Sequence, residues 1–264
     1  MQFKQIRNAT ARIYYAGKVY LLDPWLAAKD AMGYMAYTDF KVDDSAKMYI
    51  SMPICPLPES VERILAGVDG YIVTHIHPDH IDMNIDGTVG GPLDKLLPVF
   101  VQNEEDAEIF HISGFTDVRV LSEEGLEFGD ARLIKTPALH GLKANCGSAC
   151  GVVLESENEP TLYLAGDTVW YDKVKRTLDK FRPKVIVVNA CAAEGVDFGR
   201  LIMNDDDVAA VVKAAPYAKI IASHMDNVAH ASLTRTTLGR SLKRRKLLNK
   251  VCIPEDGQVL EFSK

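Results

Sequence analysis

The 264-residue sequence predicts an α/β protein. Short apolar runs of strand length alternate along it with amphipathic segments of helix length, a pattern typical of sheets covered by helices. There is no internal repeat, low-complexity tract or long Pro/Gly/Ser linker, and a hydrophobic content of 47% is enough to fill a large core. We therefore expect a single domain spanning residues 1–264.

The N-terminal part contains a predicted hairpin and then a long segment without periodicity. Residues 11–15 and 19–22 are apolar, aromatic-rich runs joined by a turn that contains Gly17, and the second run ends at Asp23. Segments as long as residues 25–58 without a regular period are usually functional or mobile. We expect this segment to be a lid over a functional site, although it could instead pack against another subunit; its aromatic residues include Trp25, Tyr34 and Tyr37.

From residue 59 onward, helix signals and strand signals alternate. Buried strands read as continuous apolar runs, and helices as amphipathic segments with acidic first turns or glycine stops. We expect, in order, a short helix at 59–65, a strand at 70–74, a helix at 103–112, strands at 118–121 and 131–136, a hairpin of 152–155 with 161–165, a strand at 185–189, a helix at 205–215, a strand at 219–222, a helix at 233–248 and a closing strand at 258–262.

The charge balance and the hydropathy pattern restrict the partners of the chain. The 36 acidic residues exceed the 30 basic ones, so the chain as a whole has no electrostatic reason to bind nucleic acid or anionic lipid. The N-terminus has no signal-like apolar stretch, and no window approaches the ~18 apolar residues of a membrane span. The five scattered cysteines contain no C-x-x-C pair, which is typical of reduced thiols. We expect a cytoplasmic protein without a membrane or nucleic-acid partner.

A cluster of histidines directly follows the predicted strand at 70–74. It places three imidazoles and one carboxylate within six residues, in the order His75, His77, Asp79 and His80. His75 and His77 are two residues apart, so both point to one side while the chain stays extended. Imidazole and carboxylate together suit Zn, Mn or Fe rather than Ca. The cluster therefore predicts a metal site.

Three further residues of ligand type each follow an apolar strand. They are His140, Asp167 and His224. The carboxyl ends of strands are where α/β sheets collect their ligand sites, so we expect these side chains to join the cluster. The combined set of five histidines and two aspartates exceeds what one tetrahedral ion uses. Two divalent metal ions are implied.

The order of these motifs resembles that of the metallo-β-lactamase superfamily over nearly the whole chain. The shared features are first strands ending at Asp23, then H-x-H-x-D-H, a lone histidine, a Gly-Asp pair and a final histidine. The resemblance implies a four-layer αββα sandwich with a dinuclear site at one edge. It also implies which residues bind which ion: His75, His77 and His140 the first, Asp79, His80 and His224 the second, with Asp167 bridging the two.

Within the superfamily, the chain looks most similar to the branch of the L-ascorbate-6-phosphate lactonases. The similarity rests on the run from Leu21 to Trp25, on Ala165-Gly166-Asp167-Thr168 and on the short C-terminal part. An oxygen-reducing flavodiiron protein would have an acidic residue in place of His77. A glyoxalase II would need a larger domain after His224 than the 40 residues that follow it in a chain of 264.

The ligand set and the resemblance together predict a metal-dependent hydrolase. Water shared by two divalent ions is acidic enough to give a nucleophile near neutral pH, and the ions polarise a carbonyl or phosphoryl oxygen. We expect Asp79 to orient that water or shuttle its proton in addition to binding metal. Asp23 could accept an N–H from a ligand imidazole, or it could only form an Asp-Pro turn.

Three further residues are weaker candidates for substrate contacts. Trp170 and Tyr171 follow the Asp167 loop and could wall the pocket, although core packing is the commoner use of aromatic side chains. His230 could contact substrate from a loop, or it could cap a helix or face solvent.

The expected substrate is a small cytoplasmic ester or lactone, which could be phosphorylated. One alternative is a phosphodiesterase acting on a small nucleotide or RNA, although the acidic balance disfavours RNA. Another is a metal-binding protein without turnover. Zn, Mn and Fe all suit the ligand set, and a homo-oligomer is compatible with the sequence.

Overall fold

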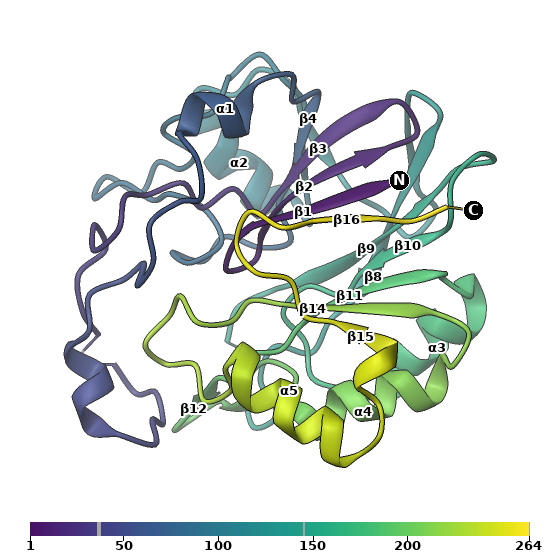
Figure 1. Ribbon diagram of the computed structural model, residues 1–264. Coiled ribbons are helices and arrows are strands. Elements are labelled where there is room, and N and C mark those ends of the chain that lie inside the picture. The colour runs from purple at the N-terminus through teal and green to yellow at the C-terminus, as the bar shows by residue number, and fades with distance from the viewer. Residues whose placement is uncertain (36–37, 145, 264) are drawn as a thin grey trace.

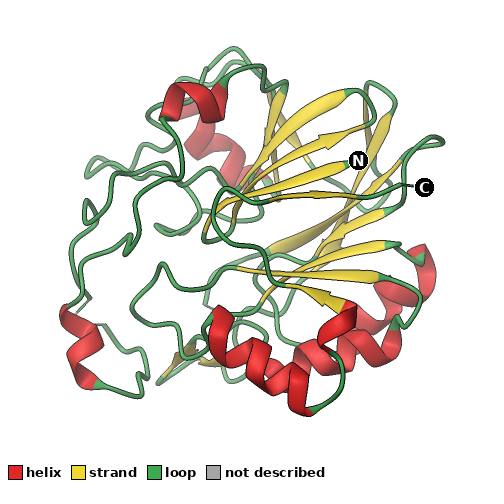
Figure 2. Ribbon diagram, in the orientation of Figure 1, coloured by secondary structure: helices red, strands yellow, loops and turns green. Residues whose placement is uncertain are grey.

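The computed structural model describes residues 1–35, 38–144 and 146–263; Tyr37, one of the aromatic residues expected in the lid, lies outside these ranges. Two seven-stranded sheets stack face to face, and helices lie on both outer faces (Figures 1 and 2). This confirms the four-layer αββα sandwich that the sequence resemblance implied. Both termini lie at the end of the sandwich opposite the long segment formed by residues 25–58 (Figure 1).

The first sheet has the strand order β16-β1-β2-β3-β4-β5-β6. Strands β16, β1, β2 and β3 are antiparallel, whereas β3, β4, β5 and β6 run parallel. Two helices cover its outer face (Figure 1). The bounds are β1 Gln2–Arg7, β2 Thr10–Tyr15, β3 Lys18–Leu22, β4 Gly70–Ile72, β5 Val99–Val101, β6 Val118–Val120, β16 Val259–Glu261, α1 Val61–Leu65 and α2 Glu104–Ile112.

The second sheet has the strand order β15-β14-β11-β10-β9-β8-β7. Strands β7 to β10 are antiparallel neighbours, whereas β10, β11, β14 and β15 run parallel. Three helices cover its outer face (Figure 1). The bounds are β7 Leu126–Phe128, β8 Ala131–Pro137, β9 Cys150–Glu155, β10 Leu162–Leu164, β11 Val185–Asn189, β14 Lys219–Ser223, β15 Val251–Cys252, α3 Asp172–Phe181, α4 Asp205–Ala214 and α5 Arg235–Arg244.

Apolar side chains fill the three spaces between the four layers. One cluster lies between the two sheets, a second between the first sheet and α1 and α2, and a third between the second sheet and α3 to α5. Strand β11 is buried at all five positions because it has a layer on each side, which explains its continuous apolar sequence. The sandwich is thus a rigid frame for the loops at its edge.

Most expected elements are present, with ends that differ by a few residues. The helix expected at 233–248 is α5, which begins after the cap Thr234 and ends at Arg244, before a 3-10 turn at Leu248–Lys250. The elements that were not predicted from the sequence include β1, β5, β7, β15 and the small hairpin of β12 (Glu194–Gly195) with β13 (Gly199–Arg200). Helix α3 was not predicted from the sequence either.

Residues 25–58, here called the strap, contain no strand or α-helix in the part that the structure describes. Their regular structure there is a 3-10 turn at Ser45–Tyr49, together with isolated bridges from Gly33 to Met52 and from Phe40 to Gly195. Trp25 is 1% exposed and packs in the core cluster of the second sheet, so this residue is not part of a lid. No helix within the described ranges is long and apolar enough to cross a membrane.

Candidate metal centre

The seven residues of the expected ligand set meet at one edge of the sandwich. The histidine cluster lies in the loop after β4 of the first sheet. The other three side chains follow β8, β10 and β14 of the second sheet. Because β4 and its parallel neighbours end at this edge, as do β10, β11 and β14, loops from both sheets converge there. The set comprises His75, His77, Asp79, His80, His140, Asp167 and His224.

The ligand atoms form three overlapping groups, each of which could hold a metal ion. Within each group, one ligand atom from every residue lies within 4.8 Å of the others. The groups are His75 with His77 and His140, His75 with His80 and Asp167, and Asp79 with His80 and His224. The first and third groups coincide with the two triads that the resemblance implied, and the second connects them through Asp167.

The charges of the site fit divalent cations. Asp167 Oδ2 lies 3.3 Å from His80 Nε2, and Asp79 Oδ2 lies 3.2 Å from His224 Nε2. Both aspartates are buried, and none of their ion pairs within the described ranges involves a lysine or arginine. Buried carboxylates need a compensating positive charge. Metal ions among the imidazoles would supply it.

The two imidazoles on the side of His140 are suited to bind metal at neutral pH. Burial lowers the pKa of His77 to about 4 and holds the pKa of His75 well below its usual value. Both rings are therefore neutral at neutral pH. A neutral imidazole offers a nitrogen lone pair, which is the form that binds a metal.

His80 shows the opposite behaviour. Burial lowers the pKa of His80, but the carboxylates of Asp167 and Asp23 outweigh burial and raise that pKa to about 10. Burial likewise opposes ionisation of Asp167, but positive charge on His80 and His224 lowers the pKa of this carboxyl well below its usual value. Protons on the imidazoles thus neutralise the carboxylates, which is the role that bound cations would take.

Neighbouring groups orient the ligands. Asp23 Oδ2 lies 2.9 Å from His80 Nδ1, and the same carboxylate accepts hydrogen bonds from Thr74 N and Thr74 Oγ1. His140 Nδ1 lies 3.1 Å from the carbonyl oxygen of Leu201. Such partners fix the tautomer and the plane of a ligating imidazole. Asp23 therefore occupies the place that the sequence analysis expected for it.

Asn189 is a functional candidate that the sequence analysis missed. Its Nδ2 donates a 2.7 Å hydrogen bond to Asp167 Oδ1, leaving Asp167 Oδ2 to face His75 and His80. Asn189 is the last residue of β11, so it lies at a strand end like the ligands themselves. A polar residue at the end of an apolar run was the signal that could have identified it.

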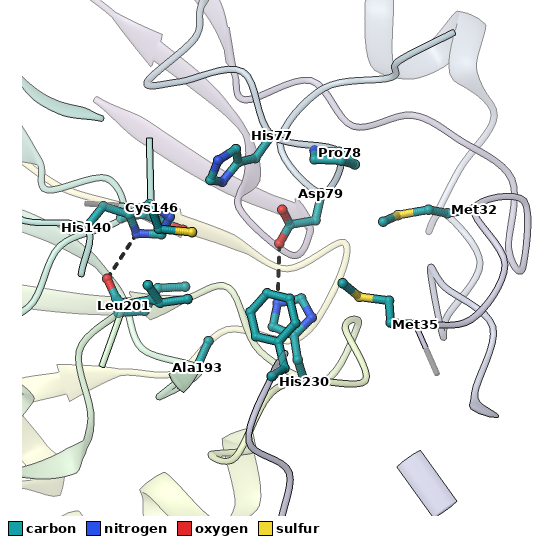
Figure 3. Close-up of a pocket in the computed structure, with 13 residues that line it drawn as sticks. Met32, Met35, His77, Pro78, Asp79, His140, Cys146, Ala193, Leu201 and His230 are labelled. Carbon is teal, nitrogen blue, oxygen red and sulfur yellow. Dashed lines mark hydrogen bonds and ion pairs between the residues drawn. The ribbon is translucent and has the colours of Figure 1, made fainter. Parts of the chain in front are cut away.

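A cavity of about 190 Å³ adjoins the ligand groups (Figure 3). The strap covers it with Met32, Met35 and Phe40, none of which was expected from the sequence. Of its lining residues in the described ranges, none is a lysine or arginine. The remaining lining residues are His77, Pro78, Asp79, His140, Cys146, Asp167, Ala193, Leu201, Ile202 and His230.

The three weaker candidates fall in different places. His230 lines the cavity, with its Nε2 3.9 Å from Asp79 Oδ2. Trp170 and Tyr171 are partly buried against the core cluster of the second sheet and do not line this cavity in the described part of the chain. The structure thus brings His230 to the site and leaves the other two at the core.

Two curated proteins align with the sequence, whereas no protein-family model matches it. The UPF0173 protein YddR of Bacillus subtilis is 40% identical over 266 residues, which cover 99% of this chain and 100% of the relative. A UPF0173 metal-dependent hydrolase of Koribacter versatilis is 28% identical over 144 residues, covering 52% of this chain and 58% of that protein. The similarity to YddR extends over the whole chain.

Two solved structures of hydrolases are also similar to this chain over its whole length. An isothiocyanate hydrolase from gut bacteria of Delia radicum superposes with a TM-score of 0.90 at 36% identity, over 100% of both chains. A possible metal-dependent hydrolase of Veillonella parvula superposes with a TM-score of 0.89 at 37% identity, over 98% of both chains. The metallo-β-lactamase fold protein YhfI of Bacillus subtilis, at 13% identity and a TM-score of 0.63 over 98% of this chain and 99% of its own, shares the fold.

None of these relatives is named as a lactonase, so the similarity to the lactonase branch stays a prediction. The fold, the converging ligand groups and the full-length relatives agree with one another. The chain belongs to the UPF0173 family and is a metal-dependent hydrolase with the metallo-β-lactamase fold.

Proposed function

We propose that the protein hydrolyses a small uncharged electrophile, with an organic isothiocyanate as the leading candidate. The cavity is the observation that carries this proposal, because thioether, aromatic and aliphatic side chains line it beside the ligand groups. Its volume of about 190 Å³ is close to that of an apolar cavity of roughly 150 Å³ that binds benzene. No lysine or arginine lines the cavity in the described ranges, so a phosphorylated substrate would have only the metal ions to compensate its charge, whereas an uncharged substrate needs no further cation.

The proposal includes two divalent metal ions per chain. His75, His77 and His140 would hold one ion, Asp79, His80 and His224 would hold the other, and Asp167 would contact both. When bound, the ions lower the pKa of the water they share and polarise the substrate. Zn, Mn and Fe all suit these ligands.

Side chains of this protein carry the remaining tasks. Asp79 is ionised, because positive charge on neighbouring histidines outweighs its burial and lowers its pKa, so its carboxylate accepts a hydrogen bond from the attacking water and orients it. The methionines of the strap and Phe40 hold the organic group and exclude bulk water. In the balanced reaction, water and R–N=C=S give R–NH₂ and COS. A C–O bond forms at the central carbon, the C–N bond breaks, and nitrogen takes both hydrogens of the water.

The relative from Delia radicum gut bacteria supports this substrate class, since it is an isothiocyanate hydrolase with 36% identity over the full chain. An uncharged ester or lactone would place its carbonyl carbon where the isothiocyanate carbon lies, so it remains the alternative substrate. We also propose that residues 1–264 act as one domain. Neither sheet alone carries a complete ligand set, because the histidine cluster follows β4 and the other three ligands follow strands of the second sheet.

A substrate screen with defined metal content tests the proposal. The protein is loaded with Zn, Mn or Fe in turn and assayed with benzyl isothiocyanate, a panel of uncharged lactones and bis-p-nitrophenyl phosphate, in buffer without thiols or amines that react with isothiocyanates. We expect turnover of the isothiocyanate, dependent on added metal. Turnover of lactones alone would contradict the isothiocyanate assignment, and preference for the phosphodiester would contradict an uncharged substrate.

A further inference from the structure

His230 is buried in the cavity wall, yet no hydrogen bond joins either of its ring nitrogens to another described residue. Its Nδ1 is fully buried without a partner, and its side chain is 8% exposed. Its Nε2 lies 3.9 Å from Asp79 Oδ2, which is too far for a hydrogen bond. Buried polar groups nearly always have a partner. Of the two ring nitrogens, Nε2 is the one beside Asp79 at the cavity, so Nε2 is the nitrogen for which we infer a ligand.

The ring plane of His230 is fixed although neither nitrogen has a hydrogen-bond partner among the described residues. Phe40 of the strap stacks on it with ring centroids 4.3 Å apart and an angle of 18° between the planes. The loop that carries His230 is held at its far end by Arg235, which pairs with Asp226 and Asp256. In Figure 3 the His230 ring lies directly below the carboxylate of Asp79. The imidazole is therefore held in place before any substrate binds.

His230 lies outside the three groups of ligand atoms that could hold a metal. It is nevertheless next to one of their members, Asp79, and it shares the cavity with His77 and His140. A substrate atom that approaches the ligand groups through this cavity would come within reach of the imidazole. His230 is therefore placed where its imidazole could donate a hydrogen bond to the substrate.

We propose that His230 is a catalytic residue outside the metal set. The Nε2–H of its neutral imidazole donates a hydrogen bond to the terminal heteroatom of the substrate, which is the sulfur of an isothiocyanate, as negative charge collects there. A fixed donor aimed at developing charge stabilises the transition state more than the ground state. Phe40 is a positioning residue that sets the plane of the ring. The inference rests on the proposed site, but it does not require that isothiocyanates are the substrate.

The first test uses the thiocyanate ion, a stable linear anion with sulfur and nitrogen ends. It is titrated into the cobalt-loaded protein, and the visible spectrum of the cobalt reports binding. We expect the Kd of thiocyanate to rise at least about tenfold in His230→Ala, whose donor is lost. His230→Gln keeps a side-chain N–H and is expected to restore part of the affinity. Phe40→Leu keeps an apolar side chain without the stacked ring, and a smaller rise is expected.

Cobalt content and the thermal unfolding midpoint are measured for every variant, with His111→Ala on α2 as a control that leaves all values unchanged. Loss of cobalt from His230→Ala would overturn the proposal, because it would make His230 a ligand or a structural support. A Kd for His230→Ala within twofold of that of the unmodified protein would also overturn it. The proposal would also be overturned if the unmodified protein does not bind thiocyanate, or if His230→Gln binds it no better than His230→Ala.

The second test uses whichever compound the substrate screen identifies. His230→Ala should lower kcat on the order of 10²-fold, as for loss of one preorganised donor, with a smaller change in KM and unchanged metal content. An unchanged kcat would contradict the role of His230. If no isothiocyanate is turned over, the proposed substrate fails, whereas the thiocyanate titration still decides the role of His230.

Discussion

The metal centre and the strap are the two walls of one cavity, and they are built in different ways. Each ligand at the centre lies in a loop that follows a strand of one of the two sheets, and Asp23 and Asn189 form hydrogen bonds that orient His80 and Asp167. The strap has no strand or α-helix in its described part. Its position depends on a few tethers to the sandwich.

Arg7 provides the main tether of the strap. Its buried guanidinium donates to the carbonyl oxygens of Trp25 and Ala27 near the start of the strap and of Cys55 near its end. The tip of the strap, here the residues around Asp39 and Lys41, is held by two backbone hydrogen bonds to the β12–β13 hairpin. Lys41 N donates to Glu194 O, and Val196 N donates to Asp39 O. The two sheets thus fix the positions of the ligands, whereas the bonds that anchor the strap set the shape of the cavity.

The largest expected effect comes from removing ligands of the rigid wall. His77→Ala and Asp167→Ala should each lower turnover by about 10³-fold or more, because the metal-activated water is lost. Metal content measured on the purified variants should fall in parallel. Asp179→Ala, at an exposed position on α3, is the matched control. Full turnover in Asp167→Ala would show that the centre does not perform the reaction.

A smaller effect, on metal affinity, is expected from replacing Asn189, which donates a hydrogen bond to Asp167. Asn189→Ala should weaken metal affinity by about 10–100-fold, as is usual for groups that orient a ligand. Competition with a chelator of known affinity measures this, and excess metal should restore most of the turnover. Asn158→Ala, at the exposed turn between β9 and β10, is the control. Equal metal affinity in both variants would mean that the hydrogen bond to Asp167 has no role in binding.

The anchoring of the strap is tested by comparing the effects of Arg7→Met and Arg12→Met on stability. Arg7→Met should lower the free energy of unfolding by about 3 kcal/mol, because it leaves buried carbonyl groups without a donor. Limited proteolysis should then cut within residues 25–58. Arg12 also donates to three carbonyl oxygens, but two of these bonds are exposed, so Arg12→Met should cost only about 1 kcal/mol. Similar costs for both variants in urea denaturation would argue against Arg7 as the main tether.

The smallest effect is expected at the tip of the strap. Lys41 and Glu194 form an ion pair with side chains 49% and 33% exposed. Exposed pairs contribute little, so Lys41→Ala should change the free energy of unfolding by less than about 1 kcal/mol and leave turnover within about twofold. A large fall in turnover would show that this pair, rather than the backbone bonds, holds the tip.

The same difference explains what could be predicted from the sequence. His75, His77 and His80 were recognisable because histidines at this spacing are typical metal ligands. The apolar run before them also indicates a strand whose carboxyl end lies at the edge of the sheet. Asn189 followed the same rule and could have been found. Met32 and Phe40 could not, because the path of the strap depends on bonds from Arg7 to backbone carbonyls. Every residue has a carbonyl, so these bonds leave no pattern in the sequence.

Counting bound metal ions while turnover is measured decides whether two ions at this site perform the reaction. The protein is stripped with a chelator, retitrated with Zn or Mn, and assayed at each step while bound metal is counted by native mass spectrometry. We expect no turnover without metal and full recovery when two ions are bound per chain. Full turnover by the metal-free protein would contradict this expectation.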